Sequence, residues 1–128
     1  MRTLLGLALV LLSACQTDIP REGARCDVDK YDYVCDKGAL WQCRPRTRVW
    51  LLESHCSGPA GCTIARPPGV VPTPSCDARE GDLCGVGRFV PICAADRTAQ
   101  LSCIDGKITG TACPVGCKDG MCQSPAVK

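Results

Sequence analysis

Residues 22–35 read EGARCDVDKYDYVC, and residues 80–93 read EGDLCGVGRFVPIC. In both stretches two residues lie between Glu-Gly and a cysteine, and eight residues separate that cysteine from the next. The likeness continues downstream, where Ala-x-Trp-x-Cys at 39–43 corresponds to Ala-x-Leu-x-Cys at 99–103. Self-similarity of this kind marks repeated structural units. The sequence therefore predicts two tandem modules.

The two modules differ mainly by one insertion. Pro59-Ala-Gly-Cys62 corresponds to Pro114-Val-Gly-Cys117. RPPGVVPTPS then precedes Cys76, where the second module has only KDGM. Prolines fix the backbone and remove hydrogen-bond donors. We therefore expect an extended, polyproline-type loop over residues 63–75, rather than a helix or a strand.

Within each module the pattern is strand and turn. Residues 33–35, a turn at Asp36-Lys37-Gly38 and residues 40–43 predict a hairpin, and residues 49–52 predict a third strand. In the second module the corresponding strands are predicted at residues 89–93, 99–103 and 108–111, with a turn at Asp105-Gly106.

Side chains alternate between the two faces of a strand. Ala39 and Trp41 should therefore share the face of Cys43, and Ala99 and Leu101 the face of Cys103. The 13 glycines and 10 prolines interrupt every candidate helix.

Thirteen cysteines in 128 residues are typical of a disulfide scaffold in an exported protein. Met1-Arg2, an apolar run at 4–12 and Ser13-Ala14 predict a secretory signal peptide, too short to remain as a membrane span. The run Leu12-Ser13-Ala14-Cys15 resembles the lipobox of bacterial lipoproteins. That resemblance implies a diacylglycerol on Cys15, cleavage before it, and acylation of the freed amine, typically with palmitate. Lipidation of Cys15 would account for the one cysteine of the thirteen that has no partner when the other twelve pair.

The other twelve cysteines are predicted to form three disulfides within each module. Six cysteines allow fifteen pairings, and the sequence leaves these open. Modules of this size bury little apolar surface, so the disulfides, at about 2–4 kcal/mol each, must supply much of the stability. The cysteines concerned are Cys26, Cys35, Cys43, Cys56, Cys62 and Cys76 in the first module, and Cys84, Cys93, Cys103, Cys113, Cys117 and Cys122 in the second.

The expected fold is thus small and disulfide-rich, with two tandem β-hairpin or meander modules and little or no helix outside the signal peptide. We expect the chain to be divided into a lipoprotein signal peptide (1–14), a tether (15–21), a first module (22–79, with the proline-rich loop 63–75), a second module (80–124) and a tail (125–128).

Several kinds of chemistry find no support in the sequence. There is no Cys-x-x-Cys motif, and His55 is the single histidine, so neither a zinc site nor a thiol oxidoreductase nor a catalytic triad is predicted. Without Arg2, fourteen Lys and Arg face thirteen Asp and Glu, which gives no field that would attract nucleic acid. We expect a protein that is not an enzyme and uses no cofactor or metal.

One stretch, CRPRTRVWLL at 43–52, suggests a partner. If it is extended, Arg44, Arg46, Arg48 and Trp50 share its outer face. Three guanidiniums and an indole suit anionic polysaccharide, lipid headgroups or an acidic protein surface. In the alternative interpretation, nearby aspartates pair with this row across strands and simply neutralise it. These are Asp27, Asp29, Asp32 and Asp36.

The lipobox, the Glu-Gly-x-x-Cys starts and the two six-cysteine units together resemble the cysteine-rich outer-membrane lipoproteins of gliding, social soil bacteria. These include small lipoproteins needed for contact-dependent gliding motility. The resemblance implies a cell-surface role in motility or adhesion, with a protein or polysaccharide partner. An outer-membrane location also agrees with Gln16, which stands where inner-membrane lipoproteins carry aspartate.

Two other functions stay open. One is an inhibitor of secreted proteases that offers the loop between Cys62 and Cys76 as a rigid bait. The other is a passive structural protein of the envelope.

Overall fold

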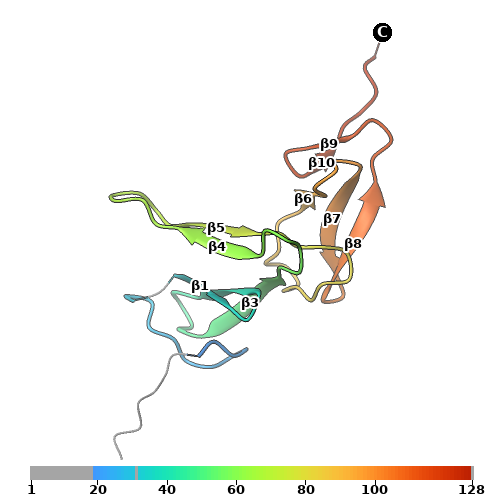
Figure 1. Ribbon diagram of the computed structural model, residues 1–128. Coiled ribbons are helices and arrows are strands. Elements are labelled where there is room, and N and C mark those ends of the chain that lie inside the picture. Colours follow the sequence, from blue (N-terminus) through green and yellow to red (C-terminus); the bar gives the residue numbers. More distant parts are fainter. Residues whose placement is uncertain (1–18, 31, 128) are drawn as a thin grey trace, which may run out of the picture.

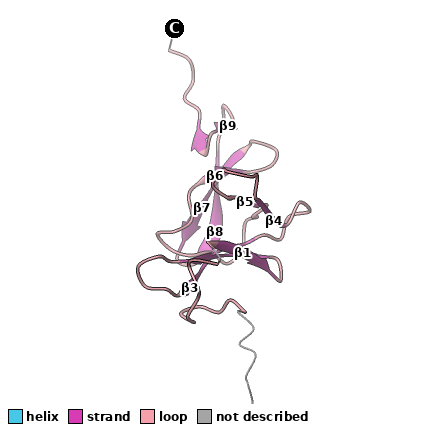
Figure 2. Cartoon of the chain, turned by 90° about the vertical axis from the view of Figure 1, so that its left-hand side faces the viewer, coloured by secondary structure: helices cyan, strands magenta, loops and turns pink. Residues whose placement is uncertain are grey.

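The computed structural model describes residues 19–30 and 32–127 (Figure 1). The predicted signal peptide, the predicted lipidation site Cys15, and residues 16–18 of the predicted tether lie outside this part of the chain. The described residues form strands and turns (Figure 2), and no helix among them is long and apolar enough to cross a membrane. The predicted small, disulfide-rich β fold is confirmed.

Each module consists of a three-stranded antiparallel meander followed by a two-stranded hairpin. In the first module these are β1 (Tyr33–Asp36), β2 (Ala39–Cys43) and β3 (Trp50–His55), then β4 (Cys62–Ala65) and β5 (Thr73–Cys76). In the second they are β6 (Ile92–Cys93), β7 (Ala99–Ile104) and β8 (Lys107–Ala112), then β9 (Cys117–Lys118) and β10 (Met121–Cys122).

The predicted proline-rich loop is only partly a loop, so the prediction of no strand over residues 63–75 is wrong. β4 and β5 pair antiparallel, with Ile64 opposite Pro74. Proline is tolerated there because a strand of a two-stranded hairpin has an edge on which the missing N–H is not needed. The hairpin projects from the body of the molecule (Figure 1) and exposes Val70 and Val71 near its tip, at 60% and 76%.

The twelve cysteines of the two modules are all paired, and each pair stays inside its own module, as the repeat predicted. Both modules join the first cysteine to the third, the second to the fifth and the fourth to the sixth. The pairs are Cys26–Cys43, Cys35–Cys62 and Cys56–Cys76, then Cys84–Cys103, Cys93–Cys117 and Cys113–Cys122.

The backbone hydrogen bonds along the outer strand of each meander repeat between the modules, as the disulfides do. Beside β3, the N–H of Gly23 donates to Trp50 O (2.8 Å), that of Trp50 to Ala24 O (2.8 Å) and that of Cys26 to Arg48 O (2.9 Å).

Beside β8 the same three bonds recur 58 residues later. Gly81 donates to Ile108 O (2.9 Å), Ile108 to Asp82 O (2.8 Å) and Cys84 to Gly106 O (3.0 Å). Each Glu-Gly-x-x-Cys start is therefore an additional strand-like segment on the outer edge of its meander.

Each module has a small core around its first disulfide. Trp50 (0% exposed) packs with Cys26 and Cys43, and Trp41 lies against this cluster as its parity predicted. In the second module Ile108 (2% exposed) takes the place of Trp50. Ile108 faces Cys103 across the sheet just as Trp50 faces Cys43.

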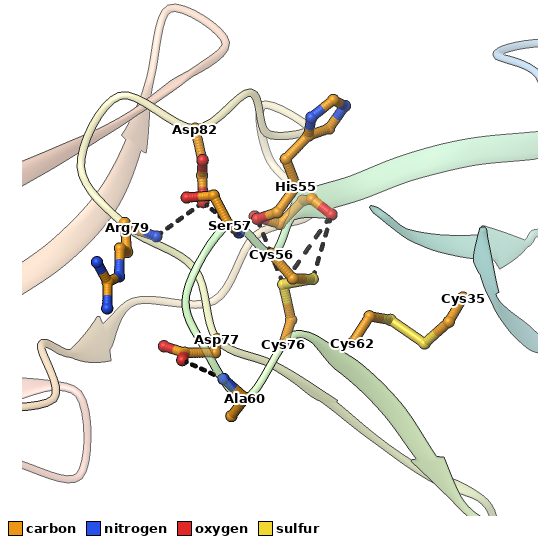
Figure 3. The surroundings of a disulfide bond; sticks show 11 residues. Cys35, His55, Cys56, Ser57, Ala60, Cys62, Cys76, Asp77, Arg79 and Asp82 are labelled. Atoms are coloured by element: carbon orange, nitrogen blue, oxygen red, sulfur yellow. Dashed lines mark hydrogen bonds between the residues drawn. A yellow bond between two sulfur atoms is a disulfide. The ribbon is translucent and has the colours of Figure 1, made fainter. Parts of the chain in front are cut away.

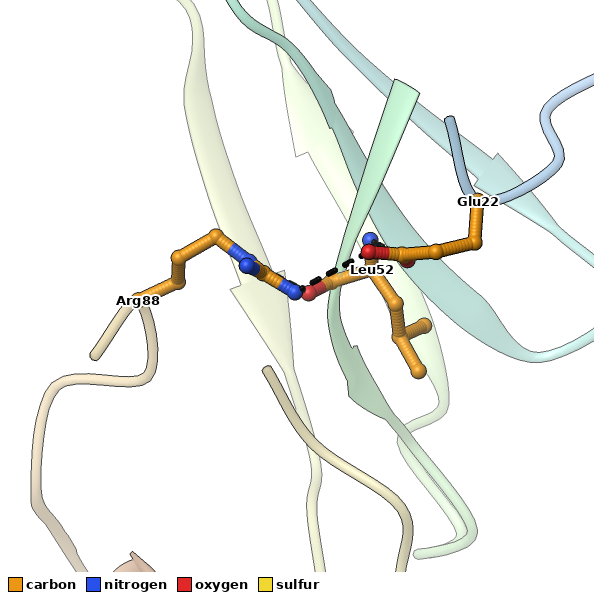
Figure 4. A network of polar contacts seen from close by, with 3 residues as sticks. All are labelled: Glu22, Leu52 and Arg88. Atoms are coloured by element: carbon orange, nitrogen blue, oxygen red, sulfur yellow. Dashed lines mark hydrogen bonds and ion pairs between the residues drawn. The ribbon is translucent and has the colours of Figure 1, made fainter. Parts of the chain in front are cut away.

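The two modules are joined along the outer edge of β3 (Figure 4). The Leu52 N–H donates to Glu22 Oε2 (2.8 Å), and the Leu52 carbonyl accepts from Arg88 Nε (3.1 Å). Arg88 also forms an ion pair with Glu22, with 3.3 Å between Nη2 and Oε1. Further along, Gly85 N–H donates to Glu53 O (2.9 Å) and His55 N–H to Leu83 O (2.8 Å).

The connection between the modules is fixed by two carboxylates (Figure 3). Asp77 accepts from the Ala60 N–H (3.0 Å), and Asp82 accepts from the N–H groups of Ser57 (3.1 Å) and Arg79 (2.8 Å). Burial tends to raise the pKa of Asp82, but hydrogen bonds from Ser57 and Arg79 outweigh it and hold the pKa below its usual value. The modules are thus held against each other rather than freely tethered.

Replacing Gly85 by alanine tests the junction. A Cβ at this position would collide with the Leu52 carbonyl oxygen and lie 2.5 Å from Arg88 Nε. We expect Gly85→Ala to cost about 1–3 kcal/mol of stability. It should also speed hydrogen exchange of the His55 amide, whereas Val86→Ala at the exposed neighbouring position should do neither. Denaturant unfolding and amide exchange measure this, and unchanged His55 exchange would contradict it.

Candidate functional site

The predicted arginine row lies in a turn, not in a strand. Residues 44–48, called here the arginine turn, connect β2 to β3. The Arg48 N–H donates to Arg44 O (2.8 Å), the Arg44 N–H donates to Val49 O (3.1 Å), and Arg48 has a left-handed backbone (φ 52°). The second module makes the same connection with the two-residue turn Asp105-Gly106.

The prediction that Trp50 lies on the outer face is wrong. Counting side chains by twos holds only while the chain stays extended, and the turn between Arg44 and Arg48 breaks the count. Trp50 pairs directly with Cys43, and residues opposite each other on antiparallel strands point to the same face. The indole therefore belongs to the core, and the candidate surface consists of the arginines without it.

The guanidiniums of Arg44, Arg46 and Arg48 make no ion pair or hydrogen bond within residues 19–30 and 32–127. Arg46 and Arg48 are exposed, and Arg44 is half-buried. The alternative interpretation required aspartates to neutralise them. In the described part of the chain, none of those aspartates forms an ion pair. The aspartates are Asp27, Asp29, Asp32 and Asp36.

A cleft between the modules, called here the junction cleft, continues this cationic surface. It has a volume of about 470 Å³ and lies between the first sheet and the segment that contains Arg88 and Phe89. Arg44 and Arg88 line both this cleft and a shallow depression over the arginine turn. Gln42 donates to the Tyr33 hydroxyl (3.1 Å) on its wall.

Glu53 lines the same cleft, and a β-bulge in β3 places it there. Trp41 faces Leu52 and Leu40 faces Ser54, so Glu53 has no partner on β2. Burial raises the pKa of Glu53 above its ordinary value, although Arg44 and Arg88 act in the opposite direction. Its carboxylate accepts no hydrogen bond from any residue that the structure describes. The cleft thus combines a half-buried acid with two guanidiniums, a hydroxyl and an amide.

The arginine turn lies at the amino-terminal end of the molecule. Arg25 pairs with Val49 in an isolated bridge, and the Cys26 N–H donates to Arg48 O. The turn is therefore hydrogen-bonded to the segment that directly follows the predicted tether.

The single histidine takes no part in this surface. Figure 3 shows His55 at the end of β3, next to Cys56 and its disulfide with Cys76. Its backbone carbonyl lies 3.4 Å from the Cys76 sulfur. Among the described residues, no cluster of histidine, cysteine, aspartate or glutamate could hold a metal ion.

Sequence reasoning missed Glu53 and Arg88. A signal for Arg88 was present, because aligning the repeats places it opposite Lys30, so both modules carry a cation four residues after their first cysteine. No signal marked Glu53, since the bulge depends on pairing between strands.

Comparison of the chain with models of protein families, with curated proteins and with solved structures finds no match. Function must therefore be inferred from the geometry of the arginine turn and the junction cleft.

Replacing Glu53 by glutamine tests the electrostatics of the cleft. A carboxyl whose folded pKa lies above its unfolded pKa loses stability as the pH rises through that interval, because the folded state holds the proton more tightly. We expect Glu53→Gln to raise the melting temperature at neutral pH. The gain should vanish below the ordinary glutamate pKa. Thermal melts across this range measure it, and a lower melting temperature at pH 7 would refute the assignment.

Proposed function

We propose that the protein is a non-enzymatic lipoprotein of the outer membrane, anchored through Cys15, that captures an anionic polymer at the cell surface through its arginine turn. A negatively charged polysaccharide or an acidic protein segment would bind there. The setting is gliding motility or adhesion.

The observation that carries this proposal is the arginine turn itself. Three guanidiniums stand on one turn, and their charges are not matched by any ion pair in the described chain. Guanidinium binds carboxylate, sulfate and phosphate groups through paired, parallel hydrogen bonds. A row of guanidiniums that form no ion pair supports binding to a partner with repeated negative charges.

The position of the turn supports the same function. Ten residues lie between Cys15 and Cys26, which reach about 35 Å at most. A lipid on Cys15 would keep the turn close to the membrane surface. Anionic polymers attached to the outer membrane would then meet it at high local concentration.

The test is a triple substitution of the turn, Arg44→Gln, Arg46→Gln and Arg48→Gln. Each exposed charge pair contributes roughly 0.5 kcal/mol, so the variant should lose about tenfold in affinity for an acidic polysaccharide. Binding of the wild type should also weaken with added salt. Interferometry on immobilised alginate or lipopolysaccharide, with uncharged dextran as reference, measures both.

The matched control removes three exposed cations from elsewhere, with Arg79→Gln, Arg97→Gln and Lys118→Gln. It changes the net charge equally but leaves the turn intact. Equal loss of binding in the two variants would show a general charge effect and would remove the turn from consideration. The control variant should melt like the wild type. The triple variant should melt slightly lower at neutral pH, because Glu53 loses the attraction of Arg44.

A second candidate function, inhibition of secreted proteases, is favoured by the β4–β5 hairpin. Two disulfides fix its base, because Cys62 and Cys76 face each other and are bonded to Cys35 and Cys56. A projecting loop held in this way loses little conformational freedom on binding.

For this candidate the exposed tip is the bait, with Val71 as the residue offered to the protease. The oxidised chain should inhibit at least one member of a panel of serine and cysteine proteases at micromolar concentration. Val71→Asp should abolish that inhibition. Full protease activity in the presence of the wild-type chain would exclude the function for the classes assayed.

A further inference from the structure

The repeat exposes a difference between the outer edges of two equivalent strands. Along β3 the edge is occupied to its end, by residues 23–26, by the side chains of Glu22 and Arg88, and by residues 83–85 of the second module. Along β8, residues 81–84 occupy only the beginning, up to Ile108.

The rest of the β8 edge is open. Alternate residues of an antiparallel strand turn their peptide groups outward, so after Ile108 these are Gly110 and Ala112. Neither has a backbone hydrogen-bond partner on that side among the residues described here. In its register with β7, Gly110 takes the position that Leu52 has in β3, and Ala112 takes the position of His55. Leu52 bonds to Arg88, and His55 bonds to Leu83.

The Cys113–Cys122 disulfide lies beside this edge but does not block the binding of a strand. The Cys122 sulfur lies 3.8 Å from the Ala112 carbonyl. In the first module the Cys76 sulfur lies 3.4 Å from the corresponding His55 carbonyl, while the docked segment bonds to the His55 N–H. The two arrangements coexist in the first module, so they are compatible in the second.

Glu80 places a negative charge beside the open edge of β8. It is the counterpart of Glu22, and a Cβ added to Gly110 would lie 3.1 Å from its Oε2, so its carboxylate lies over Gly110. Glu22 is paired with Arg88, which comes from the docked module. Glu80 is exposed and has no ion pair within the described ranges. The carboxylate that receives an arginine in the first module lacks one in the second.

We propose that the open edge of β8 is a docking site for an extended strand of a partner protein that begins another six-cysteine module of this kind. Such a strand has a cysteine, then a glycine against the β8 backbone, and an arginine or lysine three residues after the glycine that pairs with Glu80. It would bind β8 as residues 83–88 bind β3, by adding a strand to an open edge.

The partner is a different protein, not a second copy of this chain. In the first module Asp27 stands at the position of Gly85. A Cβ at Gly85 collides with the facing carbonyl, so a strand that carries Asp27 does not fit the same geometry. Residues 83–88 of a second copy are already bound to its own β3.

The probe is a synthetic peptide with the sequence of residues 81–89 in which Cys84 is replaced by serine. Titrated into the isotopically labelled, oxidised chain, it should shift the amide resonances of Gly110 and Ala112 with saturation. A peptide with Gly85→Ala should cause no such shift. Glu80→Gln in the protein, or Arg88→Ala in the peptide, should weaken binding about threefold, as expected for an exposed ion pair.

Asp105→Asn is the control, because it removes one exposed acid of the same module and should leave peptide affinity unchanged. Unshifted Gly110 and Ala112 amides at millimolar peptide would overturn the proposal. Shifts at His55 alone, which would mean exchange at β3, or equal binding of the Gly85→Ala peptide would do so as well. The arginine turn takes no part in this experiment, so its outcome is independent of the proposed function.

Discussion

The structure depends on a pairing of cysteines that is the same in both modules. Each core is a small cluster around one disulfide, with Trp50 buried in the first module and Ile108 and Leu101 in the second. Burial on this scale leaves a module of this size with little stability of its own. The crosslinks restrict the unfolded chain and hold the strands in register. The exposed loops then have freedom to vary in sequence, as the arginine turn and the β4–β5 hairpin do.

A second constraint acts on backbone groups. The outer edge of β3 would expose its N–H and C=O groups if nothing covered it. The start of its own module covers the first part, and the start of the next module covers the last part. Between them Glu22 and Arg88 bond to both polar groups of Leu52. The junction cleft, with Glu53 on its wall, exists because the second module docks at this edge.

The sequence predicts the parts of this structure that depend on neighbours in the chain. Glu-Gly-x-x-Cys repeats predict the modules, and local turns such as Asp105-Gly106, with two left-handed residues, predict the hairpins. What it does not predict depends on distant pairing. The contact between Glu22 and Arg88 joins residues 66 apart. The inward position of Trp50 follows from its pairing with Cys43, which parity along the chain misassigned.

The β4–β5 hairpin has a practical consequence. Its counterpart, β9–β10, keeps the same pairing of its two cysteines, Cys117 opposite Cys122, although only four residues lie between them instead of thirteen. The two modules thus carry this loop at different lengths on the same disulfide scaffold. Loop-closure entropy grows only slowly with length. An epitope or a fluorescent label placed at the exposed tip of β4–β5, between Val70 and Val71, would make the protein visible by microscopy in living cells while the sulfur framework stays intact.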